Sequence, residues 1–300
     1  MEQLSNLTIQ PSFKCNYNCS YCYLGKLRED NCLLDLGLLN ERLVEIRQYF
    51  NIGKVQILGG EPSILEQKYF YDLYKEVSEY KTSVVSNFSN LWLLDFCLQT
   101  GTHLTVSFNE ERPHYKDTLS NLRKCKGLQC ISLSSVVLPS LIDKPAEKVI
   151  STYDELGFNV FFLKYNQSVL SQQVYDLTTS QYTRFLEQII LEYRKENHAF
   201  KIENESLLND TEYKASCDHF LFINPNGKYS TITYTGEMEQ FVEFDSLEKY
   251  ISFSKKTYEE ILDKCKSCDM FNECQSRFML SSQQNKCKKL FELRKRLFNE

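Results

Sequence analysis

The sequence lacks any long apolar segment. No stretch of its 300 residues approaches the run of about 18 apolar residues that a membrane-spanning helix needs. The first six residues are polar and contain neither the basic nor the apolar region of a secretory signal. These absences argue against a helical membrane protein and predict a cytoplasmic protein that does not associate with membranes.

An excess of basic residues is also absent. The chain carries 35 Lys and Arg against 40 Asp and Glu, which gives a net charge of −5. Proteins that bind polyanions neutralise phosphate with basic surfaces, so this balance argues against a nucleic acid as partner. The clearest basic run, residues 286–296, has leucines at helical spacing and predicts a solvated amphipathic helix (Leu290, Leu293 and Leu297).

Cysteine, by contrast, is abundant. Twelve cysteines in a chain without a secretory signal indicate metal binding or thiol chemistry, because the cytosol keeps thiols reduced. Cys15, Cys19 and Cys22 form a CX3CX2C loop after the apolar stretch 7–13. Three thiolates can bind three irons of a 4Fe-4S cluster and leave the fourth iron open for chemistry. A zinc site completed by a distant ligand and three incidental thiols are the alternatives.

Eight of the nine remaining cysteines fall into two groups, and Cys217 stands apart from both. Four of them have no ligand spacing, and we expect most to be small buried hydrophobic residues (Cys32, Cys97, Cys125 and Cys130). The C-terminal group has the spacing CX2CX5CX12C and consists of Cys265, Cys268, Cys274 and Cys287. Its four thiolates are enough for every iron of a second cluster, and a four-cysteine zinc site is the alternative.

Helical and strand patterns alternate through the first 200 residues. Strands are expected at 7–13, 54–58, 82–86, 103–108, 130–138 and 159–165, and helices at 35–50, 67–78, 91–100, 116–126, 146–156 and 180–195. Such alternation predicts parallel pairing through right-handed crossovers, in a doubly wound sheet or a barrel. After residue 200 the pattern changes, and Asn-Pro-Asn-Gly at 224–227 predicts a hairpin. We therefore expect domains at 1–200 and 201–300.

Two short motifs follow expected strands. Gly59-Gly60-Glu61-Pro62 comes after the second strand, where the glycines allow close approach to a ligand and the carboxylate can pair with an ammonium group. Ser86-Asn87 ends the third strand. The alternatives are a simple strand-to-helix turn for the first motif and a helix cap for the second.

Together the three motifs resemble the signature of the radical SAM enzymes, including Tyr21 just before the third cysteine. The resemblance implies that S-adenosylmethionine (SAM) binds the open iron, with its adenine near Tyr21. It assigns the SAM amino group to the Gly59–Pro62 motif, chiefly Gly60 and Glu61, and the ribose and carboxylate to Ser86 and Asn87. Phe88 departs from the family's usual glycine.

The same resemblance implies a chemistry and a fold. In this family an electron from the cluster cleaves SAM, and the resulting 5′-deoxyadenosyl radical abstracts a hydrogen atom from the substrate. The fold implied is α/β, a partial (β/α)6 TIM-like barrel with cluster and SAM at the carboxyl ends of the strands.

The cysteine-rich C-terminus resembles the SPASM or twitch domains of some radical SAM enzymes, which are small α+β domains with auxiliary clusters. Its four cysteines match the ligands of the outer auxiliary cluster. Cys217 matches one ligand of the inner cluster, but Ile232 and Phe278 stand where its co-ligands should be. We therefore expect two 4Fe-4S clusters, one binding SAM and one auxiliary, with Cys217 left over.

Relatives with such domains commonly modify peptides, so the analogy predicts an oxidoreductase acting on a ribosomally made peptide by cross-linking, oxidation or epimerisation. Oxidation of a small molecule or a protein side chain is one alternative, and a non-catalytic zinc-binding interaction protein is another. An electron donor such as flavodoxin or ferredoxin is implied. Because the cysteine loop lies close to the N-terminus, we expect leader recognition by a separate partner or by the barrel itself. No catalytic residue can be named.

Overall fold

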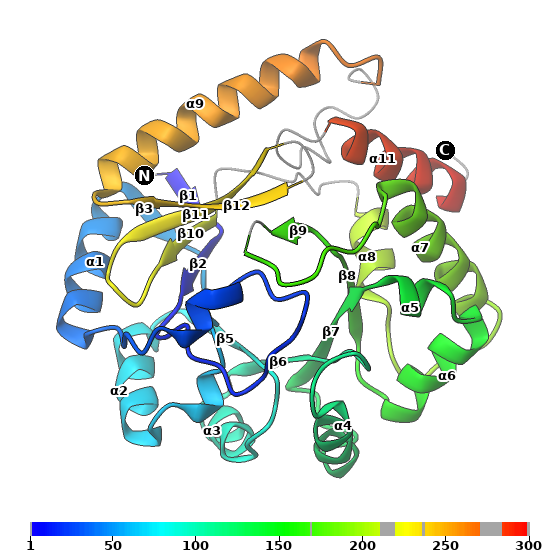
Figure 1. The fold of residues 1–300 in the computed structure, drawn as a ribbon, viewed down its shortest axis with the longest axis horizontal. Helices are drawn as coiled ribbons and strands as arrows, with labels where there is room; N and C mark the ends of the chain where they lie inside the picture. Colours follow the sequence, from blue (N-terminus) through cyan, green and yellow to red (C-terminus); the bar gives the residue numbers. More distant parts are fainter. Residues whose placement is uncertain (1, 169, 211–219, 236–237, 271–283, 299–300) are drawn as a thin grey trace.

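Six parallel strands with helices on their outer side form the centre of the molecule (Figure 1). The computed structural model describes residues 2–168, 170–210, 220–235, 238–270 and 284–298. The six strands pair in their order along the chain: β2 (Asn6–Ile9), β4 (Lys54–Ile57), β5 (Lys81–Ser86), β6 (His103–Ser107), β7 (Ile131–Val137) and β8 (Val160–Lys164). The predicted α/β fold is therefore confirmed, and the sheet is an open, partial barrel.

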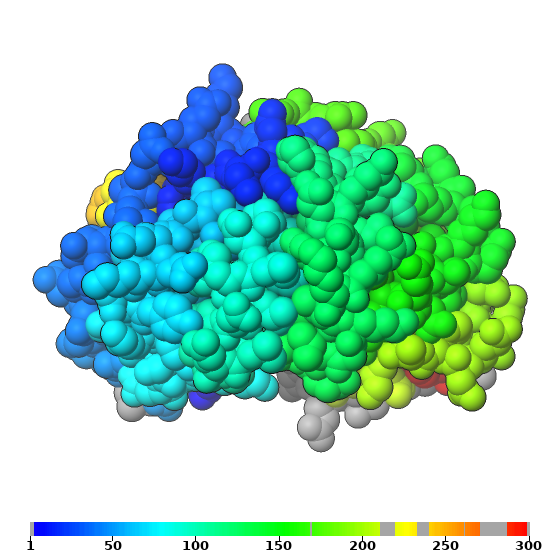
Figure 2. Space-filling view, turned by 90° about the horizontal axis from the view of Figure 1, so that it is seen from below, coloured from blue at the N-terminus to red at the C-terminus, as the bar shows by residue number. Residues whose placement is uncertain are grey.

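The helices between these strands lie within two residues of their expected bounds. They are α1 (Leu36–Tyr49), α2 (Gln67–Val77), α3 (Trp92–Thr100), α4 (Tyr115–Lys124), α6 (Ala146–Leu156) and α7 (Thr179–Tyr193). Figure 2 shows the outer face, where these segments, coloured from blue through cyan to green, form a continuous surface. Several short elements were not predicted, among them α5 (Pro139–Ile142) and the 3-10 turns η1 (Gly25–Glu29) and η2 (Pro62–Ile64).

The two faces of the parallel sheet differ sharply in composition. Alternate residues of each strand point to opposite faces. The side chains packed under the helices are apolar and fully buried, as with Leu7 and Ile9 of β2 and Val55 and Ile57 of β4. The inner face is mostly small and polar, and it lines a cavity (Asn6, Thr8, Gln56, Ser107 and Ser134). Layers of bulky branched residues usually fill a closed barrel, so this inner face leaves room for a ligand.

The C-terminal segment extends the same sheet. β10 (Phe220–Ile223) pairs in parallel with β2 and leads through the predicted hairpin to β11 (Tyr229–Thr235). Gly227 in that turn has a φ of 72°, which favours glycine. β12 (Met238–Phe244) and β9 (Gln167–Ser168) complete ten strands. Since the sheet runs across residue 200, the division into two domains stays a prediction.

Only two residues of the chain separate the two edge strands of this sheet, β8 and β9. Asn204, in α8 (Glu203–Asn209), covers the β8 edge. Its side-chain Oδ1 accepts a hydrogen bond from the Phe162 N–H at 2.7 Å, and its Nδ2 donates to the Phe162 carbonyl at 2.9 Å. A separate two-stranded sheet pairs β1 (Glu2–Leu4) with β3 (Phe50–Ile52).

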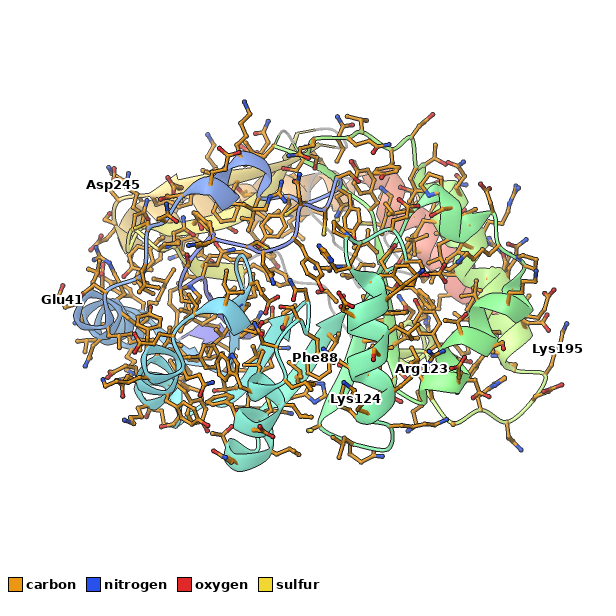
Figure 3. All side chains as sticks on the ribbon, turned by 60° about the horizontal axis from the view of Figure 1, so that its bottom comes forward. Glu41, Phe88, Arg123, Lys124, Lys195 and Asp245 are labelled. Atoms are coloured by element: carbon orange, nitrogen blue, oxygen red, sulfur yellow. The ribbon has the colours of Figure 1, made fainter. Side chains whose placement is uncertain are left out.

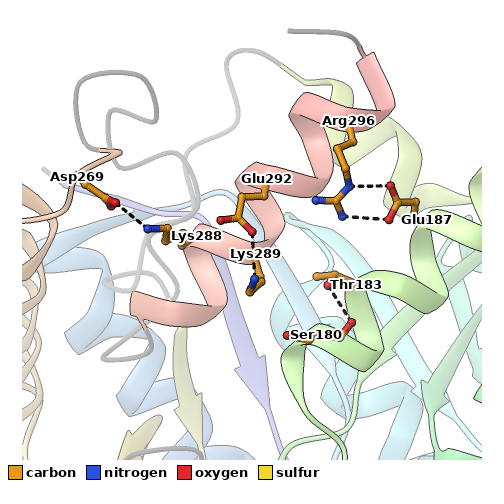
Figure 4. A network of polar contacts seen from close by, with 8 residues as sticks. All are labelled: Ser180, Thr183, Glu187, Asp269, Lys288, Lys289, Glu292 and Arg296. Carbon is orange, nitrogen blue, oxygen red and sulfur yellow. Dashed lines mark hydrogen bonds and ion pairs between the residues drawn. The ribbon is translucent and has the colours of Figure 1, made fainter.

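The basic C-terminal run forms a helix, as predicted, in α11 (Gln284–Phe298). Its leucine face packs against α7 and α8 instead of facing water, since Leu290, Leu293 and Leu297 are buried. Arg296 pairs with Glu187 of α7 through two contacts of 2.7 and 3.0 Å (Figure 4). The 20-residue helix α9 (Leu247–Lys266) lies between β12 and α11 in the chain. No helix in the described residues is long and apolar enough to cross a membrane.

The turn after β5 adopts an unusual backbone conformation. Phe88 has a φ of 58°, in the left-handed region that favours glycine. Its ring is fully buried (Figure 3). The Phe88 amide donates to Ser86 Oγ at 2.8 Å, and Asn121 Nδ2 of α4 donates to the Phe88 carbonyl at 3.0 Å. The buried ring and these bonds maintain a conformation that costs a non-glycine residue about 1–3 kcal/mol.

We predict that Phe88→Gly lowers the free energy of unfolding although glycine relieves the strain of the positive φ. Relief of backbone strain contributes about 1–3 kcal/mol, whereas truncation of a buried phenylalanine typically costs about 3–5 kcal/mol. With both contributions near the middle of their ranges, urea denaturation should show a net loss of about 2 kcal/mol. Phe88→Leu retains both the strain and most of the apolar volume, so its free energy of unfolding should fall less than that of Phe88→Gly. A glycine variant more stable than the parent would show that strain dominates at this position.

Candidate active site

The three motifs found in the sequence meet in one cavity of about 450 Å³ inside the partial barrel. Nine of the predicted residues line it: Cys15, Cys19, Tyr21, Cys22, Gly59, Gly60, Glu61, Ser86 and Asn87. They come from segments that follow β2, β4 and β5, and parallel pairing brings the carboxyl ends of these strands to one edge. Pro62 is buried at the start of η2.

The cysteine loop presents its thiols to this cavity. Cys19 is buried, and Cys15 and Cys22 are half-buried. Burial raises the pKa of Cys15 to about 11 and also raises the pKa of Cys19, so these two thiols hold their protons at neutral pH when no metal is bound. A bound metal reverses this preference by stabilising the thiolate.

The donor set fits an iron–sulfur cluster better than a single ion. Among the described residues, no three His, Cys, Asp or Glu side chains converge to hold one metal ion. In a four-iron cluster each thiolate binds a different iron, so the sulfurs need not converge. Three thiols that line one cavity satisfy that looser requirement.

Hydrogen bonds to main-chain carbonyls fix the conformation of the cysteine loop. Arg28 donates to the carbonyl of Tyr17 at 2.8 Å. The segment 170–178, which precedes α7, also contacts the loop: the Gln173 amide donates to the Ser20 carbonyl at 3.0 Å. The hydroxyls of Tyr175 and Ser20 lie 2.9 Å apart. The sequence carried no signal for this segment, because its contacts join residues about 150 positions apart.

The two glycines of the second motif are required by the protein's own packing. Gly59 has a φ of 142°, and a Cβ there would lie 2.5 Å from the Ser12 carbonyl oxygen. A Cβ on Gly60 would lie 2.0 Å from the carbonyl oxygen of Lys14. The Gly60 and Glu61 amides donate to these same two carbonyls, each at 2.9 Å. The motif therefore packs directly on the chain that enters the cysteine loop.

Glu61 connects the second and third motifs. Its carboxylate is 2 % exposed and accepts hydrogen bonds from the Ser63 amide at 2.9 Å, the Ser86 hydroxyl at 2.6 Å and the Asn87 amide at 2.5 Å. The bond to Ser63 is the expected turn interaction. The other two reach the end of β5, which a simple turn does not explain. Two carboxylate oxygens can accept about four hydrogen bonds, so one more donor can be accommodated.

Asn87 links the third motif to the cysteine loop. Its Nδ2 donates to Asn16 Oδ1 at 2.8 Å, and its Oδ1 accepts from the Ser89 amide at 2.9 Å. Helix α3 begins at Trp92 without a side-chain cap. Asn87 therefore makes an Asx-type turn with Ser89 before α3, and its Nδ2 also reaches Asn16 of the cysteine loop, a contact that a helix cap alone does not require.

Arg112 is a site residue that the sequence did not indicate. It follows β6 and lines the same cavity, and its guanidinium carbon lies 5.8 Å from the centre of the Tyr17 ring. Its buried Nε has no hydrogen-bond partner, and Arg112 forms no ion pair within the described residues. Burial opposes the charge, but the acidic groups around it, first Tyr21 and Cys19, outweigh burial and raise its pKa. The cavity thus holds a fixed cation.

The C-terminal cysteines lie partly in the described residues. Cys265 is in the last turn of α9, Cys268 follows it, and Cys287 is in α11. Cys274, Cys217 and Phe278 lie outside the described residues. Lys288 Nζ lies 2.7 Å from Asp269 Oδ2 (Figure 4). These residues directly follow Cys287 and Cys268, so the ion pair joins the two segments that carry these cysteines. Of the four cysteines expected to be buried, Cys97 and Cys125 are buried, and Cys32 and Cys130 are half-buried.

Comparison with known proteins identifies the region that carries the motifs. Residues 9–151 match the model of the radical SAM superfamily. A probable GTP 3′,8-cyclase of Thermoplasma volcanium is 29 % identical over 85 residues, which are 28 % of this chain and 25 % of that protein. The match therefore spans about a quarter of this curated relative.

Solved structures share the fold over a longer range. The structure of anSMEcpe with bound AdoMet and Cp18Cys peptide superposes with a TM-score of 0.69 and 16 % identity, covering 98 % of each chain. Streptococcus suis SuiB bound to precursor peptide SuiA has a TM-score of 0.59 and 16 % identity, covering 76 % of this chain and 59 % of SuiB. The family match over residues 9–151, together with this shared fold, supports a radical SAM domain in this chain. Members of the radical SAM superfamily are enzymes, and membership implies a 4Fe-4S cluster and SAM as cofactors.

Proposed function

We propose that this protein is a radical SAM enzyme that abstracts a hydrogen atom from a peptide substrate. The observation that carries the proposal is the convergence of Cys15, Cys19 and Cys22 with Glu61 and Arg112 on one cavity. The cavity lies at the carboxyl ends of parallel strands, where α/β enzymes bind their ligands.

The charges in the cavity suit the amino-acid end of SAM. Cys15, Cys19 and Cys22 would hold a four-iron cluster, which when bound would supply the electron for reductive cleavage of SAM to methionine and a 5′-deoxyadenosyl radical. Glu61 has an unused acceptor position for the ammonium group. Arg112 has an unpaired Nε for the carboxylate. Tyr21, buried beside the cysteines, is the residue we assign to the adenine.

The proposal of a peptide substrate rests on the similar structures. Two of them contain a peptide, Cp18Cys in anSMEcpe and SuiA in SuiB. The similarity to a probable GTP cyclase raises a small-molecule alternative. A nucleoside triphosphate needs several cations, whereas Arg112 and Lys164 are the basic residues lining the described cavity. This lining favours the peptide.

We further propose one auxiliary cluster, bound by Cys265, Cys268, Cys274 and Cys287. The Lys288–Asp269 ion pair supports it, because it joins the segments that hold Cys268 and Cys287. Ile232, at the position of an inner-cluster ligand, lines the main cavity with an apolar side chain. An apolar side chain cannot ligate iron, so this position supports the absence of an inner cluster.

The first test replaces Cys15, Cys19 and Cys22 together with alanine. Iron content of the anaerobically reconstituted protein should fall from about eight to about four, since each cluster holds four irons. Reductive formation of 5′-deoxyadenosine from SAM should be lost. Cys32→Ala, a half-buried cysteine elsewhere, should leave both unchanged. Surviving SAM cleavage in the triple variant would refute the proposal, and colourless protein with stoichiometric zinc would favour the interaction-protein alternative.

A second test concerns Arg112. Arg112→Gln removes the cation assigned to the SAM carboxylate, and a charge-assisted hydrogen bond contributes roughly 1.5–3 kcal/mol. The dissociation constant of SAM should rise by about 10- to 100-fold with iron content unchanged. Arg112→Lys should lose less SAM affinity than Arg112→Gln. Arg123→Gln, at the exposed Arg123–Glu155 pair, should leave the SAM affinity unchanged. Equal SAM affinity in the parent and the Arg112→Gln variant would exclude the assigned contact.

The auxiliary cluster is tested at Cys268. The Cys268→Ala variant should lose much of the iron of the auxiliary cluster, which holds about four irons. It should keep SAM binding at the N-terminal site, because the two cysteine groups are separate in the chain. Cys130→Ala, at another half-buried thiol, should keep all iron. Mössbauer spectra and iron counts decide the outcome. Cys217→Ala belongs in the same series, and a loss of four irons there would show an inner cluster.

A further inference from the structure

The inner face of the partial barrel contains a buried acceptor without a donor. Asn6, at the amino end of β2, is 8 % exposed. Its Oδ1 accepts no hydrogen bond from the described residues, and its Nδ2 makes one long contact of 3.5 Å to Thr8 Oγ1. Asn6 lines the same cavity as the cysteine loop. A buried unpaired acceptor is destabilising, so this carbonyl oxygen is suited to receive a donor from a ligand.

Aromatic side chains flank this acceptor. In the pairing of β10 with β2, Phe220 lies opposite Asn6 and Phe222 lies opposite Thr8. Both rings line the cavity, and Phe220 is 49 % exposed, which is unusual for a phenylalanine inside a fold. Ile232 of β11 continues the apolar surface. One amide oxygen therefore lies among side chains that favour apolar or aromatic partners.

The charged residues of the cavity lie at its opposite end. Glu61 and Arg112 follow the carboxyl ends of β4 and β6, and Lys164 is the last residue of β8. Asn6 starts β2, and a strand rises about 3.3 Å per residue, so roughly 10 Å of strand separates Asn6 from the carboxyl end of β2. A substrate ammonium or carboxylate at this depth would meet no charged partner among the described lining residues. The donor that fits is neutral.

We propose that Asn6, Phe220 and Phe222 form a specificity subsite for an aromatic side chain that ends in a neutral N–H or O–H group, a tyrosine or tryptophan of the peptide. The inference rests on the proposed function, because it takes the cavity as the substrate site. The ring packs against Phe220 and Phe222, and its polar tip donates to Asn6 Oδ1. Shorter polar side chains would leave the rings uncovered, and phenylalanine would leave the acceptor unpaired.

The probes are three blocked amino acids: N-acetyl-tyrosinamide, N-acetyl-tryptophanamide and N-acetyl-phenylalaninamide. Their dissociation constants are measured by saturation-transfer NMR on the anaerobically reconstituted full chain with SAM and without reductant. The parent should bind the first two about tenfold more tightly than the third, since only they satisfy the buried acceptor. Asn6→Leu, of similar size, should reduce this ratio to within about twofold. Asn40→Leu, at an exposed position of α1, should keep it.

Phe220→Ala provides an independent variant that leaves the acceptor in place. It should weaken all three probes by a similar factor and keep their ratio. Equal affinity of the parent for all three probes, no binding of any of them, or a full ratio retained in Asn6→Leu would overturn the subsite. The binding assay needs no SAM cleavage. Failure of the radical SAM proposal would instead appear as missing 5′-deoxyadenosine in the reduced enzyme.

Discussion

The buried carboxylate of Glu61 is the interaction on which the site depends. It accepts hydrogen bonds from residues that follow β4 and from residues that end β5, so two strand ends are held in one geometry. The amide of Glu61 donates to the carbonyl of Lys14, which joins both to the chain entering the cysteine loop. A single residue thus connects three motifs that are far apart in the sequence. Removal of a buried carboxylate with three donors would leave all three unsatisfied.

A second constraint is the backbone contact beneath that carboxylate. Gly59 and Gly60 lie so close to the carbonyls of Ser12 and Lys14 that no Cβ fits at either position. The motif is therefore defined by packing as much as by any ligand. Its conformation is set before a ligand arrives, and pre-organisation of this kind lowers the ordering cost of binding.

The charges left unpaired near the cysteines distinguish this cavity from an ordinary core. Arg112 has a buried Nε without a partner among the described residues, and Glu61, which lines the same cavity, retains acceptor capacity. Buried ionic groups are normally paired, since desolvation of a lone charge is costly. Opposite charges that do not meet each other are suited to a zwitterionic ligand. At the other end of the cavity, the polar Asn6 beside Phe220 and Phe222 makes a chemically different surface.

The sequence alone predicted the alternating strands and helices of the parallel sheet and the candidate cysteine motifs. The six parallel strands and the helices between them were predicted closely because hydrophobic periodicity is local, and the hairpin at 224–227 was predicted because its turn residues are specific. Tertiary structure decided the rest. It showed that the sheet is open, that the leucine face of α11 is buried, and that the two glycines pack on Ser12 and Lys14. Arg112 had no sequence signal, because burial and a missing partner are properties of contacts between residues distant in the chain. The same reason applies to Asn6, because the lack of a hydrogen-bond donor to its Oδ1 among the described residues depends on all the elements packed around it.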